Sequence, residues 1–148
     1  MLNKQLILLL SFVVLTTTYS TAQEEVTWKD LANVEFNRVY NEDYGIFFLT
    51  PDFGDGVRLY EGKEISIKGY FLDIAGNGEI VLLSKQPMAL CFFCGGAGPE
   101  TIIELHFKEK PSFKTDQVII VNGILELNAD NVDRCNYILN NVTGRLAD

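Results

Sequence analysis

The sequence predicts a mainly β fold: one small OB-like barrel of about five strands, with an N-terminal arm and little helix. Apolar and polar residues alternate with a period of two in several short segments, which is the pattern of half-buried strands. Glycines interrupt two of the longest segments, and a long insertion follows the second of the five. These features match a small closed Greek-key barrel, and another small β-sandwich is the alternative. An α/β fold is not favoured, because no helix of useful length separates the strands.

The first barrel strand is predicted at residues 64–71, where the alternation is clearest. Ile65, Ile67 and Phe71 share one face, and the residues between them are mostly polar. Gly69 falls within the core-facing set, and a glycine at such a position predicts a bulge where the strand bends.

Four more barrel strands are predicted further along the chain, and the Gly-Asn-Gly sequence at 76–78 predicts the first turn. In the third strand Ile103, Leu105 and Phe107 face inward, whereas Glu104 and His106 face outward. The four strands are expected at residues 79–83, 102–107, 117–127 and 137–142.

The segment before the barrel predicts a helical turn and an arm. Thr27 is placed to cap a single turn that holds Trp28 and Leu31, with Asp30 completing a capping-box variant. Two more strands or an arm are predicted at residues 34–40 and 46–49. A loop is predicted at residues 51–56.

Composition excludes several functional classes. The formal charge is −8, which argues against a nucleic-acid partner because phosphate binding needs a positive surface. The same charge argues against electrostatic docking on anionic lipid. The chain is 47% hydrophobic and 11% aromatic, so it is not a disordered acidic tail.

Residues 1–22 read as a secretory signal peptide, which leaves one domain at residues 23–148. Lys4 supplies the positive start, residues 6–15 form an apolar run, and Ser20 to Ala22 offer a small-residue cleavage site. An uncleaved N-terminal anchor is the alternative. The apolar run is shorter than the ~20 residues that span a bilayer, and no other segment approaches that length. The protein is therefore expected to be exported, either periplasmic or secreted, with no stable membrane span after cleavage.

The unusual segment is a C-x-x-C motif within the long insertion. Cys91 and Cys94 have the spacing at which two sulfurs can bind one metal ion or each other. The glycines that follow leave backbone N–H groups free to point at sulfur or at an anion, and donors of this kind would stabilise thiolate. The other residues of the motif are the candidates for binding a partner: Phe92, Phe93, Gly95, Gly96, Gly98 and Glu100.

Three interpretations of the cysteine pair remain open. A structural zinc ion needs four ligands, and His106 and Cys135 are the strongest other candidates beside Cys91 and Cys94. Two half-sites in a dimer are a variant of this interpretation. A catalytic redox pair lacks the strand-to-helix context of thioredoxin-like sites. A structural disulfide or a pair of buried thiols that clamps the loop is the third interpretation. Ordinary structural explanations exist for the other two candidates. His106 fits a solvent-exposed strand histidine, and Cys135 fits a small apolar side chain that fills space in the protein.

The stretch from Cys91 to Glu100, CFFCGGAGPE, resembles the hallmark of a family of short exported bacterial proteins of uncharacterised function. The flanking sequences 59–70 and 121–128 are similar to the same family, and the resemblance covers most of residues 26–142. It implies a secreted or periplasmic OB-like domain and implies no known reaction.

The sequence thus predicts an exported, non-enzymatic β-barrel module. Its CxxC loop would bind a metal ion, with zinc the leading cofactor, or a protein or small-molecule partner. Two alternatives stand beside this prediction. One is an extracytoplasmic thiol–disulfide redox protein that uses Cys91 and Cys94, and the other is a structural domain in which the pair is only a disulfide clamp.

Overall fold

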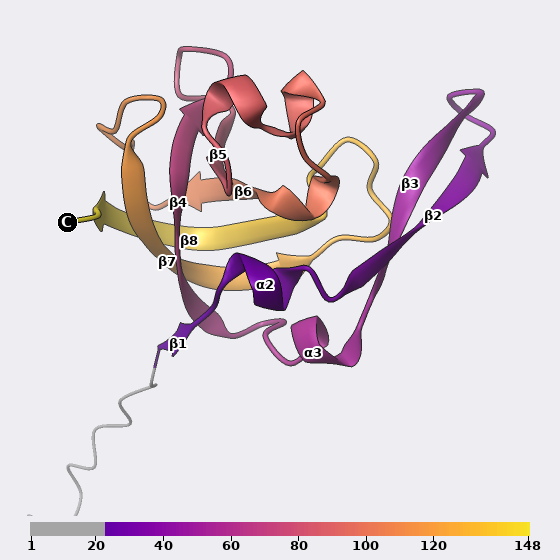
Figure 1. Ribbon diagram of the computed structural model, residues 1–148, viewed down its shortest axis with the longest axis horizontal. Helices are drawn as coiled ribbons and strands as arrows, with labels where there is room; N and C mark the ends of the chain where they lie inside the picture. Colours follow the sequence, from indigo (N-terminus) through magenta and orange to yellow (C-terminus); the bar gives the residue numbers. More distant parts are fainter. Residues whose placement is uncertain (1–22) are drawn as a thin grey trace, which may run out of the picture.

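The structure, a computed structural model, describes residues 23–148, so the predicted signal peptide lies outside the described residues. Six strands form the main sheet in the order β1-β4-β5-β6-β8-β7, and pairing of β4 with β7 closes it into a barrel (Figure 1). The elements are β1 (Glu24–Glu25), α2 (Trp28–Leu31), β2 (Val34–Asn41), β3 (Ile46–Phe53), α3 (Asp55–Arg58), β4 (Glu64–Asp73), β5 (Val81–Ser84), the 3-10 turns η1 (Met88–Leu90), η2 (Phe92–Cys94) and η3 (Pro99–Thr101), β6 (Ile102–Phe107), β7 (Val118–Leu127) and β8 (Tyr137–Leu146).

The barrel has OB topology, as predicted. Its five strands are β4 to β8, and the third and fifth of them, β6 and β8, pair in parallel while the other barrel pairs are antiparallel. All five predicted strands form, and β6 has the predicted bounds. The mainly β fold class is confirmed.

Strand β4 is shared between two neighbours, and its glycine has a different role from the predicted one. Residues 64–70 pair with β7 in an unbroken register, so the predicted bulge at Gly69 is wrong. A Cβ at this position would lie 2.7 Å from the backbone oxygen of Ser84 and 2.8 Å from Leu83 Cγ. Gly69 therefore allows β5 to approach β4 closely. Register shifts lie instead around Gly123, where β7 pairs with β8, and between Leu105 and Phe107, where β6 pairs with β8.

The barrel core is built from the inward faces that the alternation predicts. Ile65, Ile67 and Phe71 of β4 are buried, and so are the inward residues Ile103 and Leu105 of β6. The largest fully buried side chain is Tyr137, whose ring packs edge-on against Phe53 at a centroid distance of 5.5 Å. Its hydroxyl donates a hydrogen bond to the Leu31 carbonyl oxygen at 2.6 Å.

The capped helical turn before the barrel is confirmed. The Asp30 carboxylate accepts hydrogen bonds from the Thr27 backbone N–H at 2.8 Å and from the Thr27 hydroxyl at 2.6 Å. Leu31 inserts into the core, and Trp28 Nε1 donates to the Lys68 carbonyl at 2.8 Å. The turn therefore packs across one end of the barrel.

The loop predicted at residues 51–56 is wrong. Strand β3 continues to Phe53, and α3 begins at Asp55. The reason is a distant partner: Asn33 accepts hydrogen bonds from Gly54 N–H through its carbonyl and from Gly56 N–H through its side chain. These bonds support a helical start that Pro and Gly residues alone do not predict.

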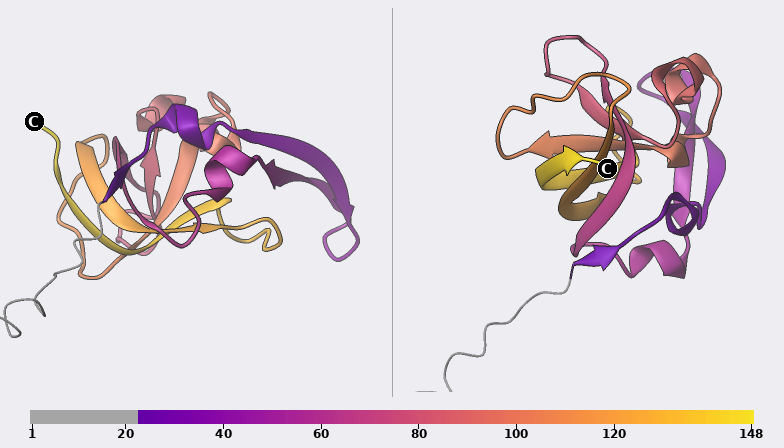
Figure 2. Two further views of the ribbon diagram at one scale, coloured as in Figure 1. Left: turned by 90° about the horizontal axis from the view of Figure 1, so that it is seen from below. Right: turned by 60° about the vertical axis from the view of Figure 1, so that its left-hand side comes forward.

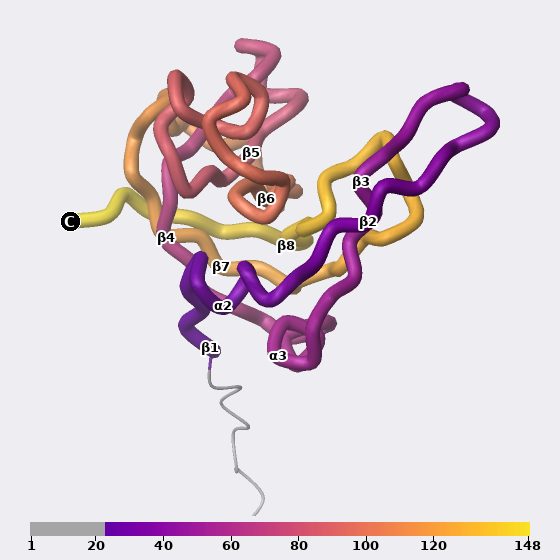
Figure 3. The backbone as a smooth tube through the Cα atoms, turned by 45° about the vertical axis from the view of Figure 1, so that its right-hand side comes forward, coloured from indigo at the N-terminus to yellow at the C-terminus, as the bar shows by residue number. Residues whose placement is uncertain are grey.

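Strands β2 and β3 form the predicted arm, a two-stranded hairpin that projects from the barrel (Figure 2). Their register runs from Val34 opposite Phe53 to Asn41 opposite Ile46. The tip contacts the connection between β7 and β8, because Tyr44 donates a hydrogen bond to Asp133 at 3.2 Å. In Figure 3 the arm and this connection rise on the same side of the barrel. Among residues 23–148, no helix has the length and apolar character needed to cross a membrane.

Candidate functional site

The CFFC loop, residues 85–101, connects β5 to β6 and folds into three consecutive 3-10 turns. Cys94 N–H donates to the Cys91 carbonyl at 3.1 Å, and Gly95 N–H donates to the Phe92 carbonyl at 2.9 Å. Gly95 then adopts φ +74°, which favours glycine and ends the turn. Gly96 N–H also donates to the Cys91 carbonyl. The prediction that these glycine N–H groups point at sulfur is therefore wrong for Gly95 and Gly96, because backbone carbonyls accept from them.

The two cysteines of the motif differ in exposure. Cys91 is fully buried in a small apolar cluster with Leu72 and Leu82 on the outer side of β4 and β5. Cys94 is exposed, and its thiol donates to the Met88 carbonyl at 3.2 Å. Desolvation, a hydrogen bond with Cys91 and the electrostatic influence of Cys91 raise the pKa of the Cys94 thiol. A raised pKa disfavours thiolate, the form that binds metal and attacks disulfides.

Cys135 packs against the same cluster as Cys91 but belongs to the β7–β8 connection. Burial and the nearby charge of Glu104 raise the pKa of Cys135 to about 12. All three cysteines are free thiols in the structure. Cys135 therefore serves as a neutral apolar side chain here.

His106 belongs to a polar network centred on Glu104, on the outward face predicted for both residues. His106 Nε2 lies 2.7 Å from Glu104 Oε1, Arg134 donates to the same oxygen at 3.1 Å, and Cys135 N–H donates to Oε2 at 3.2 Å. Within residues 23–148, no three His, Cys, Asp or Glu side chains gather in a way that would hold a metal ion. The four predicted zinc ligands are thus not assembled as one ligand set in this structure.

The Glu104 carboxylate has three hydrogen-bonding neighbours near the loop. Burial raises the pKa of its carboxyl, but hydrogen bonds from His106, Cys135 N–H and Arg134, together with the Arg134 charge, outweigh burial and lower the pKa. A carboxylate with a lowered folded-state pKa contributes stability above its unfolded pKa, and this stability disappears as pH falls through the folded value.

We expect Glu104→Gln to destabilise the protein by about 1–2 kcal/mol near neutral pH, because Arg134 and Cys135 N–H lose a charged acceptor. The difference from the unmodified protein should shrink in strongly acidic buffer, below the lowered folded-state pKa, where Glu104 itself becomes protonated. Urea unfolding at both pH values measures this. Glu64→Gln, at an exposed position of β4, is the control and should change little. A loss that is equal at both pH values would contradict the role of the Glu104 charge.

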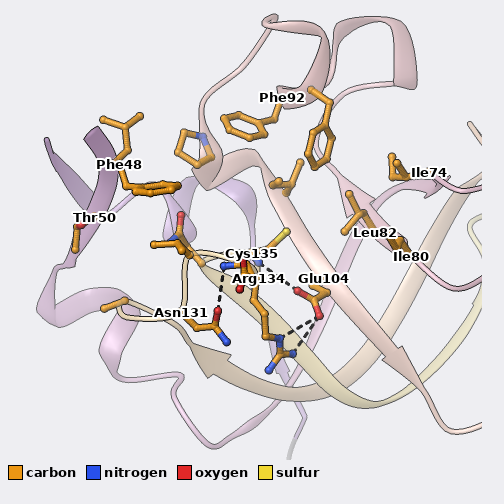
Figure 4. A pocket seen from close by; sticks show the side chains of 18 of the residues that line it. Phe48, Thr50, Ile74, Ile80, Leu82, Phe92, Glu104, Asn131, Arg134 and Cys135 are labelled. Atoms are coloured by element: carbon orange, nitrogen blue, oxygen red, sulfur yellow. Dashed lines mark hydrogen bonds and ion pairs between the residues drawn. The ribbon is translucent and has the colours of Figure 1, made fainter. Parts of the chain in front are cut away.

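A groove of about 570 Å³ lies between the arm, the CFFC loop and the β7–β8 connection (Figure 4). We call it the apolar groove. Residues from five parts of the chain line it: Phe47–Thr50 of β3; Ile74, Ile80 and Leu82 of the β4–β5 turn and β5; Phe92, Phe93 and Pro99 of the CFFC loop; Ile102 and Glu104 of β6; and Ala129 together with Asn131–Asn136 of the β7–β8 connection.

Large apolar side chains at the edge of the groove are well exposed to solvent. Phe47 and Phe93 each keep 57% of their surface exposed, Ile80 keeps 53% and Leu49 keeps 49%. Single exposed apolar residues are ordinary, but a contiguous group around a hollow marks a binding surface. The charged pair of Glu104 and Arg134 lies at one side of this apolar lining (Figure 4).

The structure brings only some of the predicted site residues together. Phe92, Phe93 and Cys135 line the groove, whereas Cys91 and Cys94 do not. Glu100 is half-buried in η3. The glycines allow close approach within the loop: a Cβ on Gly96 would lie 2.5 Å from the Leu90 carbonyl oxygen, and one on Gly98 would meet the flexible Glu100 side chain.

Sequence reasoning missed the arm as part of the site, and of the β7–β8 connection it identified only Cys135. The apolar run at residues 46–49 was the available signal, since it is continuous where a half-buried strand would alternate. Arg134 gave no such signal, because its position beside Glu104 depends on the pairing of β6 with β8.

The chain matches no protein-family model, and no curated protein matches it significantly.

Proposed function

We propose that this chain is an exported, non-enzymatic binding module that recognises an apolar partner in the apolar groove, with the CFFC loop as one wall. The observation that carries the proposal is the position of the groove on the barrel. OB-folds bind ligands on the face of their second and third strands, between the first-to-second and fourth-to-fifth connections. Here those elements are β5, β6, the β4–β5 turn and the β7–β8 connection, and all four line the groove.

The size and lining of the groove support a binding role. Its volume of about 570 Å³ is within the ~300–1,000 Å³ of typical ligand sites, which combine apolar walls with a few polar groups. This use of OB geometry is an analogy of fold. The net charge of −8 and the apolar lining do not suit the phosphates that many OB-folds bind.

A neutral apolar dye, N-phenyl-1-naphthylamine, tests the groove directly by fluorescence titration. We expect saturable binding that weakens at least about fivefold in Phe93→Ser and in Phe47→Ser, because each variant removes an aromatic wall. Leu59→Ser is the matched control, since Leu59 is 66% exposed and lies outside the groove. Equal dye affinity in all four proteins would overturn the proposal.

Zinc binding by Cys91, Cys94, His106 and Cys135 stays a separate prediction, as do the redox pair and the disulfide clamp. Intact mass before and after alkylation separates these states. For protein purified without added thiol, we expect one modification, on the exposed Cys94, in native buffer at about pH 9, where a thiol of raised pKa still reacts. After denaturation all three cysteines should react, because burial of Cys91 and Cys135 is then lost.

Each competing state gives a different mass. A native mass increased by one zinc ion, with Cys94 protected from alkylation, would support the metal site. A loss of two hydrogens, with only Cys135 reactive after denaturation, would support the clamp. If the same disulfide instead exchanges readily with glutathione, at a potential well above about −300 mV, the redox interpretation is supported.

A further inference from the structure

Strand β3 presents an edge to the apolar groove. Four consecutive residues, Phe47–Thr50, line it. Successive side chains of a strand point to opposite faces, so the side chains on one face of the arm would account for only alternate residues. Because all four residues line the groove, its wall includes the β3 backbone as well as side chains.

That edge has no strand partner within residues 23–148. β2 and β3 form a separate two-stranded sheet, so β2 occupies one edge of β3 and the other edge is unpaired. An unpaired edge offers a row of N–H and C=O groups that readily pairs with another chain. The arm also exposes half or more of Ile46 and Phe47 beside this edge.

The charges around the groove select the kind of segment that would pair there. The three segments that enclose it, residues 34–53, 85–101 and 128–136, carry seven acidic and three basic side chains. Ion pairs engage one group of each sign, since Arg134 pairs with Glu104 and Glu126 and Asp52 lies 3.8 Å from Arg58. Six acidic and two basic side chains of these segments remain outside ion pairs. The surroundings therefore favour a partner with basic groups.

We propose that the occupant of the apolar groove is an extended segment of another protein that pairs with the free edge of β3. Its alternate side chains are apolar and enter the groove, and Lys or Arg residues flank them. In this mode, main-chain hydrogen bonds provide affinity and pockets for alternate side chains provide specificity. The inference rests on the proposed function and specifies its partner.

A synthetic peptide with alternating Val and Phe residues and two Lys residues at each end tests this. We expect binding by fluorescence anisotropy. When the peptide is present, hydrogen exchange should slow at those amides of Phe47–Thr50 that point away from β2. The same peptide with alternate backbone amides N-methylated should bind at least about tenfold more weakly, since several hydrogen bonds are lost. Replacing the terminal Lys residues by Glu should also weaken binding, and the difference should diminish at high salt.

The outcomes separate the inference from the proposed function. If the neutral dye binds and none of the peptides does, the groove remains a binding site and the edge pairing is overturned. Equal affinity of the methylated and unmethylated peptides would also overturn it, because side chains alone would then account for binding. Sedimentation and hydrogen exchange without peptide test for a second copy of this chain. If the protein is a dimer and its β3 amides are already protected, a second copy is the occupant and the inference is wrong. Failure of both dye and peptide would remove the proposed function as well.

Discussion

Replacing Tyr137 with alanine is expected to destabilise the protein by about 3–5 kcal/mol, which is the cost of deleting a large buried aromatic ring. Tyr137 is fully buried at the start of β8, and its ring packs against Phe53 at the base of the arm. The loss would leave a cavity at the junction of the barrel, the arm and the N-terminal turn. Urea unfolding measures the effect.

Two further variants show which part of Tyr137 matters. Tyr137→Phe keeps the ring but leaves the Leu31 carbonyl without its 2.6 Å donor, so a smaller loss of about 1–2 kcal/mol is expected. Tyr40→Ala is the control, because Tyr40 is 52% exposed on the arm and should cost less than about 1 kcal/mol. Similar losses for Tyr137→Ala and Tyr40→Ala would contradict the packing described here.

Gly69→Val is expected to destabilise the barrel by about 3 kcal/mol. A Cβ at this position would lie 2.7 Å from a backbone oxygen of β5 and 3.0 Å from the Trp28 ring, and a backbone neighbour cannot move as a flexible side chain does. Valine favours strands more than glycine does, so local propensity alone would predict that Gly69→Val stabilises the protein. The crowding of β4 against β5 should decide the result.

Lys68→Val is the matched control for Gly69→Val, because it introduces the same side chain at an exposed position of the same strand. Its effect should be within about 0.5 kcal/mol. Thermal and urea unfolding of the two variants make the comparison. A Gly69→Val protein as stable as the Lys68→Val protein would show that β4 and β5 are not held as closely as described.

Much of the fold followed from local pattern. The alternation around Ile65 and Ile67 identified both the strand and its buried face, and the Thr27–Asp30 pair identified the start of the helical turn. Such features depend on residues only a few positions apart, so they can be predicted from the sequence alone. The errors were at residues 51–56, where Asn33 supplies the partners for α3, and at Gly69, where a neighbouring strand imposes the requirement.

The candidate site was predictable only in part. Phe92 and Phe93 were identified because they lie between the two cysteines, and both line the groove. The edge of β3 and Arg134 were not, because only the closure of the barrel and the placement of the arm bring them beside the CFFC loop. The predicted thiolate-stabilising donors also depended on tertiary detail, since Gly95 and Gly96 N–H groups bond to carbonyls of their own turn.

The sequence was sufficient to predict the β class, the buried faces of the strands and the presence of the unusual loop. Buried and exposed side chains alternate along a strand, so this pattern is visible within each short segment. Where the loop lies, what it faces and which edge remains unpaired were decided by the tertiary structure. Those properties depend on contacts between segments far apart in the chain, and Tyr44 with Asp133 is one such contact. No period or spacing within a single segment encodes such a contact.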